Sequence, residues 1–306
     1  MTDYPPEISD TIVDFDPDTL KRLPVNKAAL LSKWRERNVA AAVKVVEGLP
    51  EVDGDLVPAA VDDLLIRCHT EMQRISEEFQ HGARVAEVLD AIVPALREAG
   101  RDGPLRIVDI GCGTGFVLRW LTQNKRIGEG VELIGVDYNE ALIGEARRLA
   151  EAEGLVCDFR VGNAFALSEP AAVYLSTGVL HHFRGSSLAD FMRLHDQPGT
   201  DAFVHFDFFR SPMTPAGSWL FHAVRMREPL AKFDGVLSAV RSHPAEHLLK
   251  AARDGAPGFE STIYGTRLYG LPIPRVFHML VGIRPDVETF FGRHFDKRAR
   301  QLGCIR

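Results

Sequence analysis

Two kinds of hydrophobic spacing divide the chain. From Asn26 to about residue 100, apolar residues recur every three to five positions, as Leu30, Trp34 and Val39 do, which is the spacing of amphipathic helices. From Leu105 onward, short apolar runs alternate with helical patterns, as in LRIVDI followed by FVLRWLTQN. Such alternation is typical of βαβ units and a mostly parallel sheet. The pattern therefore predicts helices first and an α/β domain after them.

The α/β part is expected to contain seven strands. Five apolar runs between residues 105 and 209 predict parallel strands. Two further runs, ESTIYGTRL and RVFHMLVGI, are separated by the turn YGLPIP and predict an antiparallel pair at one sheet edge. The predicted fold class is α/β: a doubly wound, mostly parallel seven-stranded sheet with a terminal antiparallel hairpin and an N-terminal helical cap.

The same patterns divide the chain into three expected regions. Residues 1–25 are acidic and interrupted by prolines, which predicts an extended arm. Residues 26–100 are expected to form the helical cap. Residues 101–306 are expected to form the α/β domain, with a helical insertion at about 212–255.

Composition and charge limit the classes of binding partner that we expect. The 306 residues carry 36 Lys+Arg and 42 Asp+Glu, a formal net charge of −6, so no general attraction to nucleic acid or to an anionic membrane is expected. No apolar run approaches the roughly 18 residues of a membrane span, and the acidic start is unlike a secretory signal, which predicts a cytoplasmic protein. The four cysteines form no CxxC pair, which favours reduced thiols over a zinc site. No feature specifies an oligomeric state.

The segment RIVDIGCGTGFVLRW carries the most specific motif. An apolar strand ends in Asp109, glycines follow at 111, 113 and 115, and a helix is predicted from Phe116. Glycines permit a tight turn and close approach of a ligand, and a helix start offers free N–H groups. A dinucleotide loop, G-x-G-x-x-G, would have its third glycine where Phe116 stands, which argues against a nicotinamide cofactor.

This D-x-G-x-G-x-G segment resembles motif I of the class I S-adenosylmethionine-dependent methyltransferases, and the resemblance extends over roughly residues 80–285. The second predicted strand ends in Asp137 and continues YNEALIGEAR, similar to the family's D-x-S-xx-hydrophobic-xx-A-R, with Asn139 in the serine position. The third ends in GNA where the family usually has Gly-Asp-Ala. The fourth, AVYLSTGVLHHF, is similar to the L-H-H-F stretch of small-molecule methylases.

The resemblance implies S-adenosylmethionine as cofactor and S-adenosylhomocysteine as product. It implies that Asp109 holds the cofactor's amino group, that Asp137 accepts from the ribose hydroxyls, and that Asn163 receives the adenine amino group. For Asp137 a simple helix-capping role is the alternative. The full set of expected cofactor residues is Asp109, Gly111, Cys112, Gly113, Gly115, Asp137, Tyr138, Asn163, Ala164, Phe165 and Thr177.

The absence of certain family motifs excludes several classes of methyl acceptor. Residues 176–179 read STGV, where amino-group methylases of nucleic acid and protein carry Asn/Asp-Pro-Pro-Tyr, and no Pro-Cys pair of cytosine methylases occurs. Thr177 and Gly178 also cannot supply the carboxylate with which catechol-type enzymes hold Mg²⁺. We expect no bound metal and a small, apolar acceptor, with methylation at oxygen favoured over nitrogen or carbon. A nicotinamide-dependent oxidoreductase and a non-catalytic interaction protein are the alternatives.

Candidate catalytic residues lie beyond the carboxyl ends of the strands, where open α/β sheets bind ligands. His181 and His182 follow the fourth strand, and Asp207 stands near the end of the fifth. A histidine with an ordinary pKa of about 6.5 suits removal of a hydroxyl proton. Adjacent side chains are expected to diverge, so only one histidine should face the site, and we favour His182, with Asp207 as second candidate. A structural role is the alternative for all three.

Large apolar side chains after the fifth strand allow two interpretations. Phe208, Trp219 and Phe221 belong either to the ordinary core or to the wall of an apolar acceptor pocket.

Overall fold

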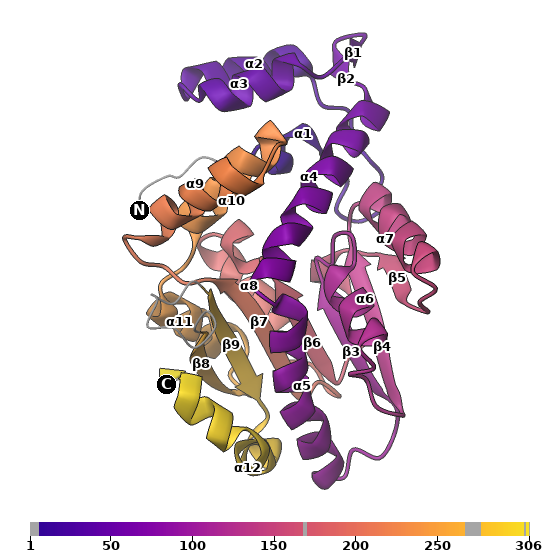
Figure 1. Cartoon of the computed structure of the whole chain (residues 1–306), viewed down its shortest axis with the longest axis vertical. Coiled ribbons are helices and arrows are strands. Elements are labelled where there is room, and N and C mark those ends of the chain that lie inside the picture. The colour runs from indigo at the N-terminus through magenta and orange to yellow at the C-terminus, as the bar shows by residue number, and fades with distance from the viewer. Residues whose placement is uncertain (1–5, 168–169, 267–276, 303, 306) are drawn as a thin grey trace. The chain divides into compact units, whose positions relative to one another are not determined.

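The computed structural model describes residues 6–167, 170–266, 277–302 and 304–305 (Figure 1). The chain forms two compact units, each described by itself below. The first contains Met1–Ile75 and Ser211–Arg241, and the second contains Ser76–Arg210 and Ser242–Arg306. None of the helices in the described part of the chain has both the length and the apolar character needed to cross a bilayer.

The first unit is almost entirely helical. Its described elements are α1 (Ser9–Ile12), α2 (Lys27–Glu36), α3 (Ala40–Glu47), β1 (Glu51–Val52), β2 (Asp55–Leu56), α4 (Pro58–Glu78, which runs on into the second unit), α9 (Thr214–Arg225) and α10 (Pro229–Arg241). Asn26 begins α2 by accepting a hydrogen bond from the Ala29 N–H at 3.0 Å, as a polar N-cap residue does. Leu30 and Trp34, at the spacing of one helical turn, are its buried residues.

The start of the chain is attached to α10 within this unit. The Asp234 carboxylate accepts from the Ile8 N–H at 2.8 Å and from the Ser9 N–H at 2.9 Å, at the beginning of α1. The Ser238 hydroxyl donates to Glu7 at 2.9 Å. The region expected to be an extended arm therefore contains a short helix that is fixed by buried polar contacts.

The second unit contains the large sheet and the remaining helices. Its elements are α5 (His81–Glu98), β3 (Leu105–Ile110), α6 (Phe116–Gln123), β4 (Val131–Asp137), α7 (Glu140–Ala152), β5 (Asp158–Val161), η1 (Ala164–Ala166), β6 (Val173–Thr177), η2 (Leu180–His182), α8 (Ser186–Arg193), β7 (Ala202–Phe208), α11 (Ala245–Gly255), β8 (Glu260–Thr266), β9 (Phe277–Ile283), α12 (Pro285–Leu302) and β10 (Cys304–Ile305).

The sheet has the predicted topology. Its strand order is β10-β8-β9-β7-β6-β3-β4-β5, and β3 to β7 are mutually parallel. Strands β8 and β9 pair antiparallel, and β9 lies against β7, so the terminal hairpin extends the parallel part. The two-residue β10 adds an eighth strand beyond the predicted seven. The chain order reverses at β3, which lies between β4 and β6, and this is the switch point where such sheets bind ligands.

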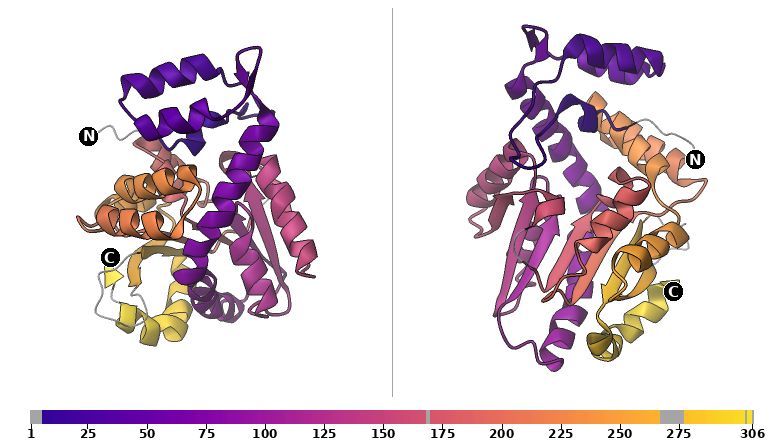
Figure 2. Two further views of the ribbon diagram at one scale, coloured as in Figure 1. Left: turned by 45° about the horizontal axis from the view of Figure 1, so that its top comes forward. Right: turned by 180° about the vertical axis from the view of Figure 1, so that it is seen from behind.

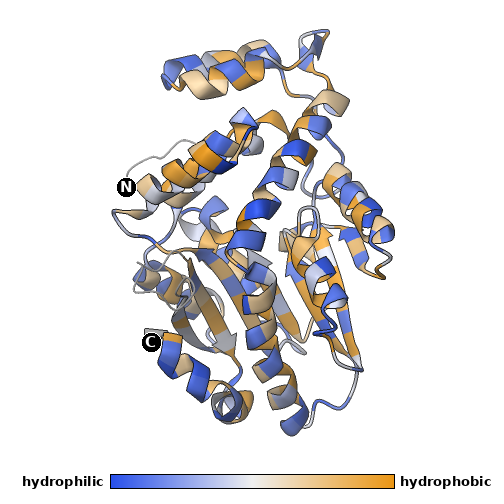
Figure 3. Ribbon diagram, in the orientation of Figure 1, coloured by the Kyte–Doolittle hydropathy of each residue, from blue (hydrophilic) through white to orange (hydrophobic). Residues whose placement is uncertain are grey.

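Helices cover both faces of this sheet (Figure 2), and its strands carry many hydrophobic residues (Figure 3). Helices α5, α6 and α12 pack on one face, with Val85, Leu89 and Ile92 of α5 in the core against the strands. Helices α8 and α11 pack on the other face. The sequence pattern predicts α5 as part of the N-terminal cap, because helical spacing does not show what a helix packs against, but the apolar residues of α5 pack against the strands. The boundary between the units accordingly lies at residues 75 and 76 rather than near 100.

The predicted helical insertion is divided between the units. Helices α9 and α10 belong to the first unit, whereas α11 packs against α8 in the second. The core interpretation of Trp219 is wrong, because 63% of its surface is exposed.

Candidate active site

The loop after β3 has the backbone that its glycines predict. Gly111 and Gly115 have φ of 68° and 73°, in the left-handed region that favours glycine. A Cβ on Gly111 would lie 2.7 Å from a methyl group of Val179, and one on Gly115 would lie 2.4 Å from the Phe159 ring. The loop therefore passes close to the segment after β6 on one side and to β5 on the other.

Asp137, at the end of β4, holds the loop in place. Its carboxylate accepts from the Gly113 N–H at 3.0 Å and from the Asn139 N–H at 2.9 Å. Burial raises the pKa of Asp137, against the opposing influence of these N–H groups and of the nearby His182. The capping role that was the alternative for Asp137 belongs to Asn139, whose side chain accepts from two N–H groups at the start of α7.

Asp109, at the end of β3, is a buried acid with an unused oxygen. Only 1% of its surface is exposed, and its Oδ1 has no hydrogen-bond partner among the described residues. Burial, reinforced by the neighbouring Asp137, raises the pKa of this carboxyl well above its usual range. An unpartnered buried carboxyl is costly, and a cationic hydrogen-bond donor would remove that cost.

The remaining predicted cofactor residues lie around the same ends of the strands. Asn163 follows β5, and its side-chain oxygen accepts from the Phe165 N–H at 2.8 Å, which begins η1. Tyr138 and Phe165 are 43% and 41% exposed. Thr177 ends β6. Burial raises the pKa of the Cys112 thiol well above its usual range, so this cysteine stays protonated and unreactive. Ala164 lies within η1.

Asp207 and His181 form a buried pair beyond β6 and β7. The Asp207 carboxylate accepts from the His181 N–H at 2.9 Å and lies 2.9 Å from His181 Nδ1. Burial alone would raise the pKa of Asp207, but His181 holds it well below its usual range. Because an ionised carboxylate only accepts, His181 Nδ1 carries the hydrogen, and the lone pair of the neutral ring is on Nε2.

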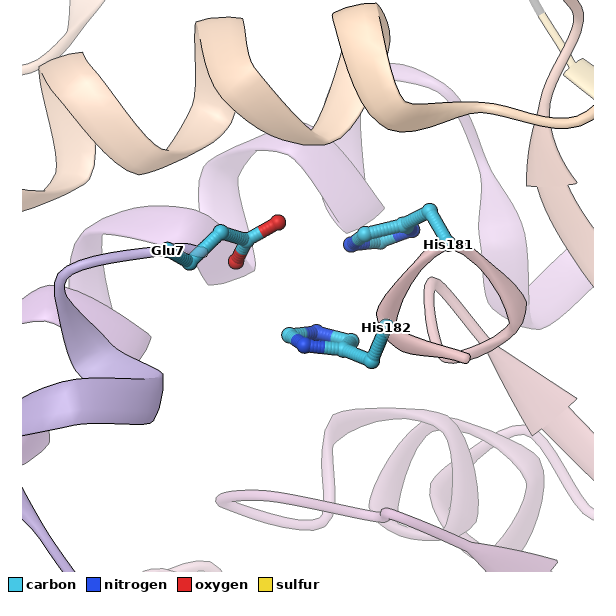
Figure 4. A group of neighbouring side chains, drawn as sticks. All are labelled: Glu7, His181 and His182. Carbon is cyan, nitrogen blue, oxygen red and sulfur yellow. The ribbon is translucent and has the colours of Figure 1, made fainter. Parts of the chain in front are cut away.

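His182 lies beside His181 rather than pointing away from it. Both rings extend from η2 to the same side, with centroids 4.5 Å apart and planes at 33° (Figure 4). The expectation that adjacent histidines diverge is therefore wrong, because rotation about the side-chain bonds offsets the divergence of the backbone positions. His182 acts electrostatically to lower the pKa of Asp137, whereas His181 is hydrogen-bonded to Asp207.

His243, which is not among the residues predicted from the sequence, also fixes η2. Its Nε2 lies 3.1 Å from the Leu180 carbonyl oxygen and 3.0 Å from that of Phe183. Burial lowers the pKa of His243, which favours a neutral ring that donates to these carbonyls. The short sequence SHP around it matches no motif, so only the fold reveals this role.

Comparisons with known proteins agree with this arrangement. Residues 107–195, from β3 to the end of α8, match a family described as a methyltransferase domain. The chain is 28% identical over 173 residues to demethylmenaquinone methyltransferase of Thermus thermophilus, a match covering 51% of this chain and 74% of the relative. A shorter match, 34% identical over 80 residues, is to carboxy-S-adenosyl-L-methionine synthase of a Nitratiruptor species and covers 26% of this chain and 33% of that protein. The chain therefore contains a methyltransferase domain, and these matches support a class I S-adenosylmethionine-dependent methyltransferase.

A solved structure shows the same fold. The plantazolicin methyltransferase BpumL, in complex with a monoazolic desmethylPZN analogue and SAH, superposes with a TM-score of 0.51 at 14% identity, over 84% of this chain and 99% of that one. In the methyltransferase described here, the domain match spans β3, the glycine loop, Asp137 and both histidines. Asp207, His243 and the whole first unit lie outside it.

Proposed function

We propose that this methyltransferase holds S-adenosylmethionine at the ends of β3, β4 and β5 and transfers its methyl group to a hydroxyl of a small, apolar molecule. The observation that carries the proposal is the unpartnered Oδ1 of buried Asp109 beside the glycine loop. The cofactor's amino group is a cationic donor of the kind that such an oxygen lacks. When bound, the cofactor supplies an already activated methyl group on sulfur.

The other residues fit the same ligand. Asp137 presents a carboxylate that can accept from ribose hydroxyls, and its bond to the Gly113 N–H links that end of the site to the loop. A side chain on Gly111 or Gly115 would need space that Val179 and Phe159 already occupy. The loop backbone thus allows a ligand to approach closely. A dinucleotide-binding loop allows the same approach with a different spacing of its glycines.

His181 is the proposed general base. Its Nδ1–H donates to Asp207, so the lone pair of the neutral ring is on Nε2, the atom that would take a proton from an acceptor hydroxyl, and Asp207 would stabilise the resulting imidazolium. This assignment revises the preference for His182, whose electrostatic influence falls on Asp137, one of the proposed cofactor residues. The remaining task of the protein is to hold the acceptor oxygen in line with the methyl group.

Apolar side chains support the acceptor class. The Phe208 ring lies 6.1 Å from His181 and 4.9 Å from Phe277, which in turn lies 5.0 Å from Phe79. These aromatic contacts bring apolar side chains beside the proposed base, which favours an apolar acceptor. The names of relatives favour a small-molecule acceptor: the Thermus protein is named for demethylmenaquinone, and BpumL was solved with a desmethylPZN analogue.

Two measurements test the proposal. Calorimetry with S-adenosylmethionine, S-adenosylhomocysteine and NAD should show binding of the first two only, and Asp109→Asn should weaken the first two. A screen with radiolabelled methyl donor should then find label on phenols or hydroxyquinones and not on matched amines. Binding of NAD alone would refute the cofactor assignment, and label on amines alone would refute the hydroxyl acceptor.

A further inference from the structure

Helix α9 turns its apolar side outward. Its buried residues are the polar Ser218 and His222, spaced by one turn. Phe221 is half-buried, but the other large apolar residues are exposed: Met213, just before the helix, by 66%, Trp219 by 63%, Leu220 by 59% and Val224 by 73%. An ordinary surface helix has the opposite arrangement, with the apolar stripe inward.

The orientation of α9 is fixed by specific contacts with α10. The Ser218 hydroxyl donates to the Gly235 carbonyl oxygen of α10 at 2.8 Å, and within α9 the His222 Nδ1 lies 2.7 Å from the Ser218 carbonyl oxygen. A Cβ on Gly235 would lie 1.8 Å from His222 Nε2, so the two helices approach this closely only because residue 235 is a glycine. Ser218 and His222 therefore belong to the interface between α9 and α10. Because this side of α9 faces α10, the apolar side of the helix faces outward.

The exposed face has no charge along its length and a basic end. Its exposed residues up to the last turn are uncharged: Pro212, Met213, Ala216, Gly217, Trp219, Leu220, Ala223 and Val224. Arg225 and Arg227 follow and are exposed, as is Lys232 on α10. Between residues 211 and 232 the one acidic residue is Glu228, which is paired with Arg67 at 3.2 Å.

We propose that α9 docks this protein on the surface of a membrane that contains anionic phospholipid. An exposed tryptophan among aliphatic side chains suits the boundary between headgroups and acyl chains. The arginines at the end of the helix complement the negative headgroups. The helix lies on the surface in this arrangement and does not cross the bilayer.

A second copy of the chain fits this face less well. The helix has 12 residues, which makes it about 18 Å long. One side of such a helix offers a few hundred Å² at most, whereas a stable protein interface buries about 800 Å² on each partner. A bilayer needs no matching surface, so a small apolar patch with basic residues is enough for reversible binding.

Co-sedimentation with vesicles tests the proposal on the full chain. Binding is expected with vesicles of phosphatidylcholine mixed with phosphatidylglycerol, weakening as salt is added, and much less with phosphatidylcholine alone. The double variant Trp219→Ser/Leu220→Ser should lower the partition coefficient about tenfold or more. Val156→Ser is the matched control, because Val156 is 95% exposed in the second unit and should not affect binding.

A second readout locates the contact. Brominated lipids should quench part of the tryptophan fluorescence of the wild-type protein, and Trp219→Phe should bind with similar affinity but lose that quenching. Unaltered vesicle binding by the double variant, or no binding to either vesicle type, overturns the proposal. Dimerisation in sedimentation velocity that the double variant abolishes would also overturn it and assign the face to a second copy.

Discussion

Asp137 combines two tasks in one side chain. Its carboxylate holds the Gly113 N–H and is the proposed partner of the cofactor ribose. Asp137→Ala removes charge-assisted hydrogen bonds worth about 1.5–3 kcal/mol each, so cofactor affinity should fall by about tenfold to a thousandfold. Calorimetry with S-adenosylhomocysteine measures this directly.

A nearby acid provides the control for that experiment. Asp158, at the start of β5, is exposed and pairs with Arg160 at 2.7 Å. Asp158→Ala should leave cofactor affinity unchanged, since it touches neither the loop nor Asp137. Equal affinities of Asp137→Ala and the wild type would contradict the ribose assignment.

His181 and His182 should differ in their effect on the pH dependence of the rate. If His181 is the base, its protonation at low pH removes the lone pair, so the rate falls toward acid. His181→Ala should lower the rate at saturating cofactor about a hundredfold or more and abolish this acid limb. His182→Ala should retain the acid limb, whatever its effect on the rate.

Asp207→Asn tests the pairing itself. An amide can donate to His181 Nδ1, which would move the ring hydrogen to Nε2 and block proton removal, so a loss of about a hundredfold is expected. Measured methyl-transfer rates of Asp207→Asn close to those of the wild type would show that the pair only positions η2.

The two histidines show which features of the site could be predicted from the sequence at the scale of single residues. The motifs predict Asp109, Asp137 and the two histidines at or just after the ends of strands, because the ends of strands and the glycine loop follow from local patterns. The preference for His182 depended on the direction in which each histidine side chain points. That direction is set by the side-chain rotamers in η2 and by the hydrogen bond between His181 and Asp207. His243 lies 61 positions beyond His182 in the chain, and only tertiary packing brings it to η2.

At the scale of elements, the glycine loop makes a sharp prediction. Gly111→Ala places a side chain at φ 68° and 2.7 Å from Val179, so it should destabilise the fold by about 1–3 kcal/mol and weaken cofactor binding. Gly144→Ala is the matched control: Gly144 lies inside α7 with nothing within 4 Å of the added Cβ, so alanine should stabilise by up to about 1 kcal/mol. Denaturant unfolding measures the free energy of unfolding of both variants. Equal stabilities of the two variants would contradict the prediction.

The elements that the sequence predicted best are those governed by one repeating pattern. Five parallel strands and a terminal hairpin follow from apolar runs separated by helical segments, and the sheet has this order. For helix α9 the sequence leaves two interpretations of the apolar residues open, ordinary core or the wall of an acceptor pocket. The Ser218 and His222 contacts with α10 decide which side of the helix faces inward, and these contacts depend on a glycine 13 positions beyond His222.

At the scale of the whole molecule, the division into units could not be read from the chain. The first unit joins the N-terminal helices to α9 and α10, which lie more than a hundred residues away in the sequence. Local patterns mark helices but not their partners, so the cap appeared to end near residue 100. Buried contacts such as those of Asp234 with Ile8 and Ser9 establish the actual pairing.

Asp234 should make the stability of the first unit depend on pH. Its carboxyl is buried, and burial together with the neighbouring Glu7 raises its pKa to about 7. In the unfolded chain an aspartate has a pKa of about 3.9. Between these values the folded state binds a proton that the unfolded state does not, so stability falls as pH rises from about 4 to about 7. The upper limit of the loss is about 4 kcal/mol, at about 1.4 kcal/mol for each pH unit.

Asp234→Asn removes this titration while keeping an acceptor for one of the two N–H groups of α1. The variant should lose about 1 kcal/mol at pH 5, where the wild-type carboxyl is protonated, and should equal or exceed the wild type at pH 8, where the buried charge is costly. Thermal unfolding at a series of pH values, with hydrogen exchange of the Ile8 and Ser9 amides, measures the crossing. Asp254→Asn, which changes an exposed acid paired with Lys250, should keep the wild-type pH profile. Parallel profiles for the wild type and Asp234→Asn would mean that Asp234 stays ionised in the folded protein and that its two hydrogen bonds outweigh the cost of its burial.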